Sequence, residues 1–242
     1  MQRAGTSFGG AYRIPIALEL RDPTELRSEY ALDRTVELEG QRVTFKRAII
    51  HPTRIAVEAE FDPANSKTIF SFADLKLIGD RGEQFALQST THVDERTQIV
   101  YFEGSSFAIP ESLTLTGSRA RAVDKDRLAL VVDTDKLKVL EAPDDRISLE
   151  RVTDQGEMLE LRLILKGIDP DDNMLYSVVE GAFKDGDGNA YEAGNGHTYG
   201  NNGEDGQYVT LRIPDKDYAQ PLSFRIFNYP AYVEEPFEIR IR

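Results

Sequence analysis

The side chains best suited to metal chemistry lie in an acidic, glycine-rich turn in the second half of the chain. Asp185, Asp187 and Asn189 place oxygens at alternate positions, as the start of a calcium-binding loop does. That loop pattern next requires glycine at its sixth position and glutamate at its twelfth, where this chain has Ala190 and Gly196. Asp185, Asp187 and Asn189 are therefore a candidate metal site, and a tight hairpin turn is the alternative.

A second acidic cluster follows the strongly apolar residues 158–165. It consists of Asp169, Asp171, Asp172 and Asn173. Adventitious calcium is a weaker expectation here, since the spacing fits no known ligand loop. The chain's histidines add no zinc site, because no two of them have the spacing of a ligand pair.

Residues 192–206 form a polar, glycine-rich stretch that offers almost nothing apolar to bury. Loops of this length often bind partners or move. The sequence thus predicts a candidate binding loop, with a solvated hairpin tip as the alternative. The side chains available for contacts are Asn195, His197, Tyr199, Asn201 and Asn202.

Other chemistries find no support in the sequence. The chain has no cysteine, which excludes thiolate catalysis, thiolate zinc sites and disulfides. It has no Gly-x-Ser-x-Gly elbow, no phosphate-binding Walker loop and no complete dinucleotide fingerprint. We predict no catalytic residue and no cofactor. A hydrolase with an unrecognised acid pair stays a third alternative. With 42 acidic residues some carboxylate pair will lie at the distance found in glycosidases, so that observation alone has no specificity.

The charge of the chain also limits its partners. Its formal net charge is −13, so phosphate backbones and anionic membrane surfaces are repelled, and we expect no nucleic acid partner. No apolar run approaches the roughly 18 residues that a membrane-spanning helix needs. The first ten residues lack the apolar core of a signal peptide.

The elements expected to position these residues are β-strands. Residues 55–61 alternate apolar and polar side chains with the period of a half-buried strand. Gly40 marks a hairpin between two further strand-like runs. Short runs of this kind, with turn signals about every ten residues, are typical of a β-sandwich. Before them, residues 12–20 predict a strand and residues 22–30 a short helix that Asp22 caps.

Several of these signals occur twice, in the same order. The repeated features are an Asp-Pro pair, a glycine hairpin and a strand that begins Pro-x-Ser, followed by one more apolar strand. The matches are Asp62-Pro63 with Asp169-Pro170, Gly82 with Gly188, residues 110–115 with 221–226, and residues 128–132 with 237–241. The first three offsets are 107, 106 and 111 residues, which indicates two tandem copies of one unit.

The repeat leads to a domain prediction. The fold is all-β, with two tandem immunoglobulin-like β-sandwich domains. Residues 1–31 form a linker with the N-terminal strand and short helix, residues 32–143 form the first sandwich, and residues 144–242 form the second. Residues 237–241 complete the second sandwich, and residues 144–242 are expected to fold alone.

Five stretches resemble a family of uncharacterised ectodomains from spore-forming Gram-positive bacteria. They are residues 32–48 (LDRTVELEGQRVTFKRA), 62–67 (DPANSK), 70–75 (FSFADL), 142–149 (APDDRISL) and 227–241 (FNYPAYVEEPFEIRI). Members of that family look like single-pass membrane proteins of the anti-sigma-factor type. The resemblance carries over no catalytic residues.

The resemblance implies a location and a role. The chain would be a non-enzymatic sensor or interaction module outside the cytoplasm, tethered through an upstream transmembrane helix to a cytoplasmic domain. Its partner would be an unknown protein or a ligand of the cell envelope. The alternative is a calcium- or glycan-binding adhesion module of the cell surface.

Overall fold

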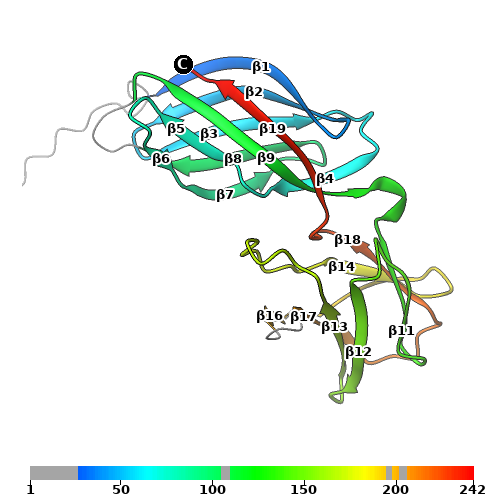
Figure 1. The fold of residues 1–242 in the computed structure, drawn as a ribbon. Helices are drawn as coiled ribbons and strands as arrows, with labels where there is room; N and C mark the ends of the chain where they lie inside the picture. The colour runs from blue at the N-terminus through cyan, green and yellow to red at the C-terminus, as the bar shows by residue number, and fades with distance from the viewer. Residues whose placement is uncertain (1–26, 105–109, 195–197, 202–205) are drawn as a thin grey trace, which may run out of the picture.

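The chain forms two β-sandwiches joined end to end (Figure 1). The computed structural model describes residues 27–104, 110–194, 198–201 and 206–242. Four antiparallel sheets contain nearly all of the regular structure of these residues, so the predicted all-β fold is confirmed. The predicted strand of residues 12–20 lies outside the described residues. Ser28 and Tyr30, predicted to end a helix, instead lie in the first strand.

The N-terminal sandwich has two facing sheets. In spatial order the first contains β1 (Ser28–Leu38), β2 (Gln41–His51), β3 (Arg54–Phe61), β8 (Thr97–Glu103) and β7 (Leu87–His92). The second contains β19 (Tyr232–Arg240), β9 (Leu113–Asp124), β5 (Lys76–Gly79) and β6 (Gln84–Phe85), and β4 (Lys67–Phe72) also pairs with β9. Their inner faces share one apolar core.

The C-terminal sandwich is built in the same way. Its first sheet contains β11 (Lys138–Glu141), β10 (Ala129–Asp133), β18 (Leu222–Ile226), β14 (Val179–Lys184) and β15 (Ala190–Glu192). The second contains β12 (Ile147–Asp154), β13 (Met158–Leu165), β17 (Gln207–Pro214) and β16 (Thr198–Asn201). A second, separate apolar core lies between these sheets.

Alternation along the strands produces both cores. In β3, Ile55, Val57, Ala59 and Phe61 are buried, while the residues between them are partly exposed. Full burial of a large apolar side chain is worth roughly 1.5–3 kcal/mol, so each core is the main source of stability for its sandwich.

The strand pairing preserves the internal repeat. Leu77 pairs with Phe85 across the hairpin of Gly82, and Phe183 pairs with Tyr191 across the hairpin of Gly188. A second match lies on the opposite sheets: the β2–β3 ladder shifts register just after Phe45, and the β12–β13 ladder shifts just after Leu149, 104 residues later. Two sandwiches with matching hairpins and bulges indicate one duplicated unit.

The final strand of each repeat, however, is exchanged between the sandwiches. Residues 237–241 lie largely in β19, which pairs with β9 of the N-terminal sandwich, and residues 128–132 lie largely in β10, which pairs with β18 of the C-terminal sandwich. The prediction that residues 237–241 complete the second sandwich is therefore wrong. The two strands take equivalent places: Ile239 lies opposite Leu115, and Leu130 lies opposite Phe224.

The register of the strands gives a repeat offset that differs from the one read in the sequence. Leu77 pairs with Leu115 in one sandwich, and Phe183 pairs with Phe224 in the other. Leu115 thus corresponds to Phe224, which is 109 residues later rather than the 111 read from the sequence. A shift of two residues leaves each side chain on the same face of the sheet, so the apolar pattern cannot reveal it.

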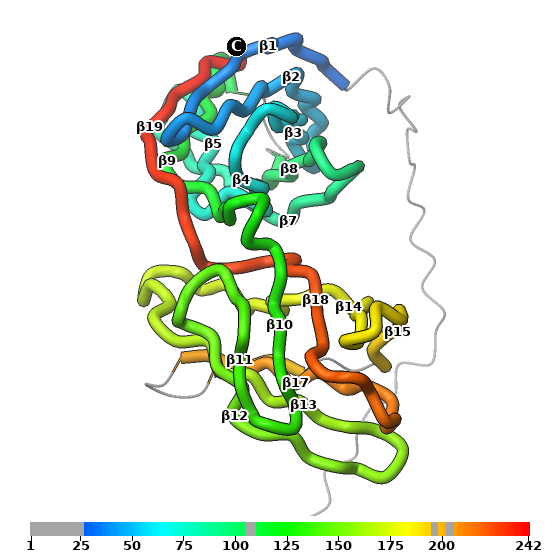
Figure 2. The backbone as a smooth tube through the Cα atoms, turned by 90° about the vertical axis from the view of Figure 1, so that its right-hand side faces the viewer, coloured from blue at the N-terminus to red at the C-terminus, as the bar shows by residue number. Residues whose placement is uncertain are grey.

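Two short connections carry the chain between the sandwiches. Gly40, Gly82, Gly156 and Gly188 have positive φ at hairpin turns, whereas the β2–β3 and β10–β11 hairpins turn without glycine. The connection after β9 is the short 3₁₀ turn Lys125–Arg127, and the connection after β18 is residues 227–231; neither contains glycine. Both connections carry the chain from one sandwich to the other, and they lie close together in Figure 2.

The predicted boundary at residues 143 and 144 differs from the division that the strands make. The chain passes between the sandwiches at residues 125–128 and 227–231. Asp144 lies inside the C-terminal half, where the buried Tyr229 donates its hydroxyl hydrogen to Asp144 Oδ1 at 2.5 Å. Arg146 donates to the other oxygen of Asp144 and to the carbonyl oxygen of Pro230. This network fixes the second connection against the start of β12.

Candidate functional site

The predicted metal residues form a hydrogen-bonded turn. Asp185 Oδ1 accepts hydrogen bonds from the backbone amides of Asp187 and Asn189 at 3.0 and 2.9 Å. Its Oδ2 accepts from the Asn189 side chain and the Tyr191 hydroxyl, both at 3.0 Å. These bonds lower the pKa of Asp185. They occupy the carboxylate that calcium would need, and the turn is explained without a metal ion. The metal site stays a prediction that this geometry does not favour.

The candidate binding loop is only partly described. Asn195, His197 and Asn202 lie outside the described residues. Tyr199 and Asn201 lie in β16, the edge strand of the C-terminal sandwich, and the side chain of Tyr199 is largely exposed. The prediction of a binding loop therefore stays open, and its two described members stand on an edge strand.

The second acidic cluster joins the two sandwiches. Arg119 and Arg121 project from β9, and each forms an ion pair with an aspartate of the loop after β13: Arg119 with Asp169 at 2.8 Å, and Arg121 with Asp172 at 2.6 Å. Tyr232 stands at the start of the exchanged strand β19, and the centre of its ring lies 4.1 Å from the guanidinium carbon of Arg119. Two of the three carboxylates expected to attract calcium loosely, Asp169 and Asp172, are thus bound to arginines of the other sandwich.

The Arg121–Asp172 pair is almost fully shielded from water. The two side chains are 6% and 4% exposed. Asp172 also accepts hydrogen bonds from the hydroxyls of Tyr176 and Tyr232. Arg121 donates to the Tyr176 hydroxyl at 2.7 Å and to the carbonyl of Phe72 at 3.1 Å. We call these four residues, Arg121, Asp172, Tyr176 and Tyr232, the junction network.

Two opposing effects set the charge of Asp172. Burial raises its pKa, but the hydrogen bonds from Arg121, Tyr176 and Tyr232 outweigh burial and lower the pKa to about 2. Burial and the bond to Asp172 raise the pKa of Tyr176. The Asp172 carboxylate is therefore ionised and the Tyr176 phenol neutral at physiological pH. Both groups already form hydrogen bonds with other members of the junction network. The junction network stabilises the joint and has no free acid or base for proton transfer.

A hollow of about 550 Å³ lies beside this network, and we call it the junction hollow. Its walls come from β4, from β7, from the loop after β13 and from the connection between β18 and β19. Its apolar lining includes Phe72, Leu87, Met174 and Phe227, and its polar lining includes His92, Asp171, Asn173 and Asn228. Phe227 and Leu87 are 48% and 43% exposed, unusually open for large apolar side chains that share one hollow.

Buried amides support the walls of this hollow. Gln98, fully buried in β8, donates through its side-chain nitrogen to the carbonyl oxygen of Phe70 at 2.6 Å. The same nitrogen lies 2.9 Å from His92 Nε2, and the His92 ring lies 6.3 Å from the ring of Phe227. His92 is thus held between the N-terminal sandwich and the connection that enters it.

The arrangement is suited to binding. The apolar side chains of Phe227 and Leu87 stand at the surface next to an acidic loop, and the only strongly perturbed carboxylate of the lining, Asp172, is already paired. Within the described residues, no group of three or more histidine, cysteine, aspartate or glutamate side chains could hold a metal ion. A partner with an apolar side chain beside a positive charge would match the lining.

Sequence reasoning found the acidic half of this site and missed the basic half. The signal was present in β9, where Arg121 interrupts the apolar run Ala120, Ala122 and Val123. A charge in a strand that is otherwise buried requires a buried partner. Phe227 gave no such signal, because sequence places it among aromatic residues that are mostly core, such as Phe224 and Tyr229.

Comparison with known proteins assigns the chain to a family. The chain belongs to the family of unknown function DUF5643, which matches residues 27–163. The match covers β1 to β12 and most of β13, so it includes the first crossing between the sandwiches. No curated protein matches the chain.

One solved structure is also similar to the chain. It is described as "the crystal structure of the conserved domain protein from Bacillus anthracis", with 12% sequence identity. The likeness covers 91% of this chain and 93% of the other, with a TM-score of 0.27, which is too low to establish a shared arrangement of strands. Separately, none of the described helical segments is long and apolar enough to cross a membrane.

Proposed function

We propose that the chain is a non-enzymatic interaction module that works outside the cytoplasm as the sensing part of a membrane-tethered regulator. The observation that carries the proposal is the junction hollow, with Phe227 and Leu87 exposed on opposite sandwiches. The tether and the anti-sigma-factor context rest on the resemblance of residues 32–48 and 227–241 to such ectodomains.

The position of the junction hollow gives binding a mechanical consequence. Leu87 belongs to β7, whereas Phe227 lies in the connection that carries the chain from β18 to β19. A partner that contacts both side chains bridges the sandwiches and favours one angle between them. Binding would thereby shift the population of angles between the two sandwiches, and a population shift of this kind can be passed on as a signal.

Charge narrows the class of partner. Asp171 lines the junction hollow, and Asp94, Glu95 and Glu180 line a smaller hollow that shares His92 and Phe227 with it. Arg225 is the one basic side chain of this second lining, and it lies 3.7 Å from Glu180. The partner we propose is a protein or cell-envelope ligand with an apolar group next to a positive charge.

The test uses the whole gene product in its own cells. Phe227→Ser should reduce the response of a reporter for the tethered regulator. Leu140 on β11 is also an exposed apolar residue and serves as the control: Leu140→Ser should leave the response unchanged. Protease added to intact cells should cleave the sandwiches. Equal responses of the two variants, or protection from protease until the cells are lysed, would refute the proposal.

A further inference from the structure

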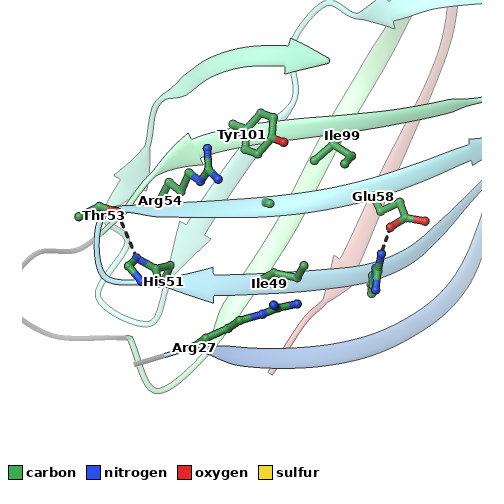
Figure 3. A pocket seen from close by; sticks show the side chains of 10 residues that line it. Arg27, Ile49, His51, Thr53, Arg54, Glu58, Ile99 and Tyr101 are labelled. Atoms are coloured by element: carbon green, nitrogen blue, oxygen red, sulfur yellow. Dashed lines mark hydrogen bonds and ion pairs between the residues drawn. The ribbon is translucent and has the colours of Figure 1, made fainter. Parts of the chain in front are cut away.

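A second hollow lies on the outer face of the five-stranded sheet of the N-terminal sandwich, away from the junction. It has a volume of about 500 Å³ and is lined by β2, β3 and β8, by the turn between β2 and β3, and by Arg27 just before β1 (Figure 3). We call it the outer-face hollow. Its lining is Arg27, Arg47, Ile49, His51, Thr53, Arg54, Ala56, Glu58, Ile99 and Tyr101.

The register of the strands creates the space. Ile49, Ala56 and Tyr101 lie in one row across β2, β3 and β8. The methyl group of Ala56 stands between two large side chains, so the surface is depressed there. Ile99 continues the apolar floor from the next row. An apolar floor with a few polar side chains around it is an ordinary feature of concave small-molecule sites.

Positive charge gathers around this floor in a protein of net charge −13. Arg47 is neutralised locally, since it forms ion pairs with Glu58 at 2.7 Å and with Glu29 at 3.1 Å. Arg27 also pairs with Glu29, at 2.9 Å. Arg54 differs from both, because it forms no ion pair with any part of the chain that the structure describes.

Aromatic stacking and the backbone hold Arg54 in place. Its guanidinium carbon lies 4.8 Å from the centre of the Tyr101 ring, and this cation–π contact does not use the N–H groups as hydrogen-bond donors to an anion. Arg54 follows a turn closed by Thr53, whose hydroxyl lies 3.1 Å from His51 Nδ1 (Figure 3). A side chain at Gly104 would come within 2.4 Å of the Arg54 amide, so glycine is required behind this turn.

We propose that the outer-face hollow binds a small anionic molecule with an apolar body. A carboxylate or phosphate group would accept hydrogen bonds from the guanidinium of Arg54, beside His51, and the apolar body would cover Ala56 between Ile49 and Tyr101. Arginine presents two parallel N–H groups to such an anion, which gives both affinity and orientation. This site is independent of the junction hollow and of the function proposed for it.

The test measures binding of three simple probes by calorimetry and by chemical-shift changes: phenyl phosphate, benzoate and inorganic phosphate. We expect saturable, millimolar binding of at least one aromatic anion and weaker binding of inorganic phosphate. Comparison of the two aromatic probes decides between a carboxylate and a phosphate as the preferred group. Arg54→Gln should weaken binding about tenfold or more, and Ala56→Leu should abolish it by filling the floor.

Arg151→Gln is the matched control, because Arg151 is an exposed strand arginine of the other sandwich. The Arg151→Gln variant should bind the probes as tightly as the unchanged chain does. All three variants should have the melting temperature of the unchanged chain, since the three positions lie on outer faces of the sheets. Equal weakening by Arg54→Gln and Arg151→Gln would show a general charge effect and overturn the proposal. Failure of every probe to bind saturably would overturn it as well.

Discussion

The exchange of strands predicts that damage near one end of the chain will weaken the sandwich at the other end. Ile239 lies in the last strand, yet its side chain is buried in the N-terminal core. Leu130 lies in the middle of the chain and is buried in the C-terminal core. Because the two residues hold equivalent places in the duplicated unit, Ile239→Ala and Leu130→Ala form a matched pair of perturbations.

The expected magnitude follows from burial. Truncation of a buried leucine or isoleucine to alanine costs about 2–5 kcal/mol, through lost burial and the cavity that remains. A single domain is stable by only about 5–15 kcal/mol, so each variant should lose a substantial part of the stability of one sandwich. For a domain of this size, every 1 kcal/mol lowers the melting temperature by roughly 4–8 °C, and the shift should exceed about 8 °C.

Hydrogen exchange followed by mass spectrometry reads each sandwich separately. Ile239→Ala should accelerate exchange in β9, β4 and β5, which belong to the first half of the sequence. Leu130→Ala should accelerate exchange in β18 and β14 and leave β9 protected. If Ile239→Ala instead loosened β18 and β14, and Leu130→Ala loosened β9, β4 and β5, the strand exchange would be refuted.

Three further predictions follow from the joint and the turns. Residues 128–231 should fold alone as a β domain that melts cooperatively when followed by circular dichroism. Residues 144–242 should not, because they lack β10 and β11 and leave β19 unpaired. Cooperative melting of this second fragment would contradict the strand pairing. The pKa of Asp172 is lowered from 3.8 to about 2, so its ionised form contributes roughly 2 kcal/mol of stability above pH ~4, which is lost as the pH falls towards 2. Urea unfolding across that pH range should show this loss of stability. Asp172→Asn should lower the stability at neutral pH by about 3–5 kcal/mol, because it leaves Arg121 buried without its counter-ion. The further loss between pH ~4 and pH ~2 should be smaller in this variant than in the unchanged chain. Calcium should raise the melting temperature only at millimolar concentrations, since Asp185 is already saturated with hydrogen bonds; a calcium-selective rise at micromolar concentrations would favour the metal site.

The candidate sites differ in how far the sequence led to them. Asp172 stood out as part of an acidic cluster, but its role depends on Arg121, which lies 51 positions earlier in the chain. Phe227 and Arg54 carried no signal of their own. Whether an aromatic or a basic side chain is exposed and unpaired depends on neighbours that only folding brings together, such as Leu87 and Tyr101.

The sequence by itself determined the strands, their buried faces, the hairpin turns and the duplication. Those features depend on local patterns: alternation with period two, glycine where φ is positive, and the recurrence of both about 106 residues later. Only the tertiary structure decided which sandwich receives each final strand. Strands β10 and β19 both place buried apolar side chains next to more exposed ones, and this local pattern does not say which core receives them. The connections at residues 125–128 and 227–231 carry the chain across the joint, where Arg121 and Asp172, 51 positions apart in the sequence, meet.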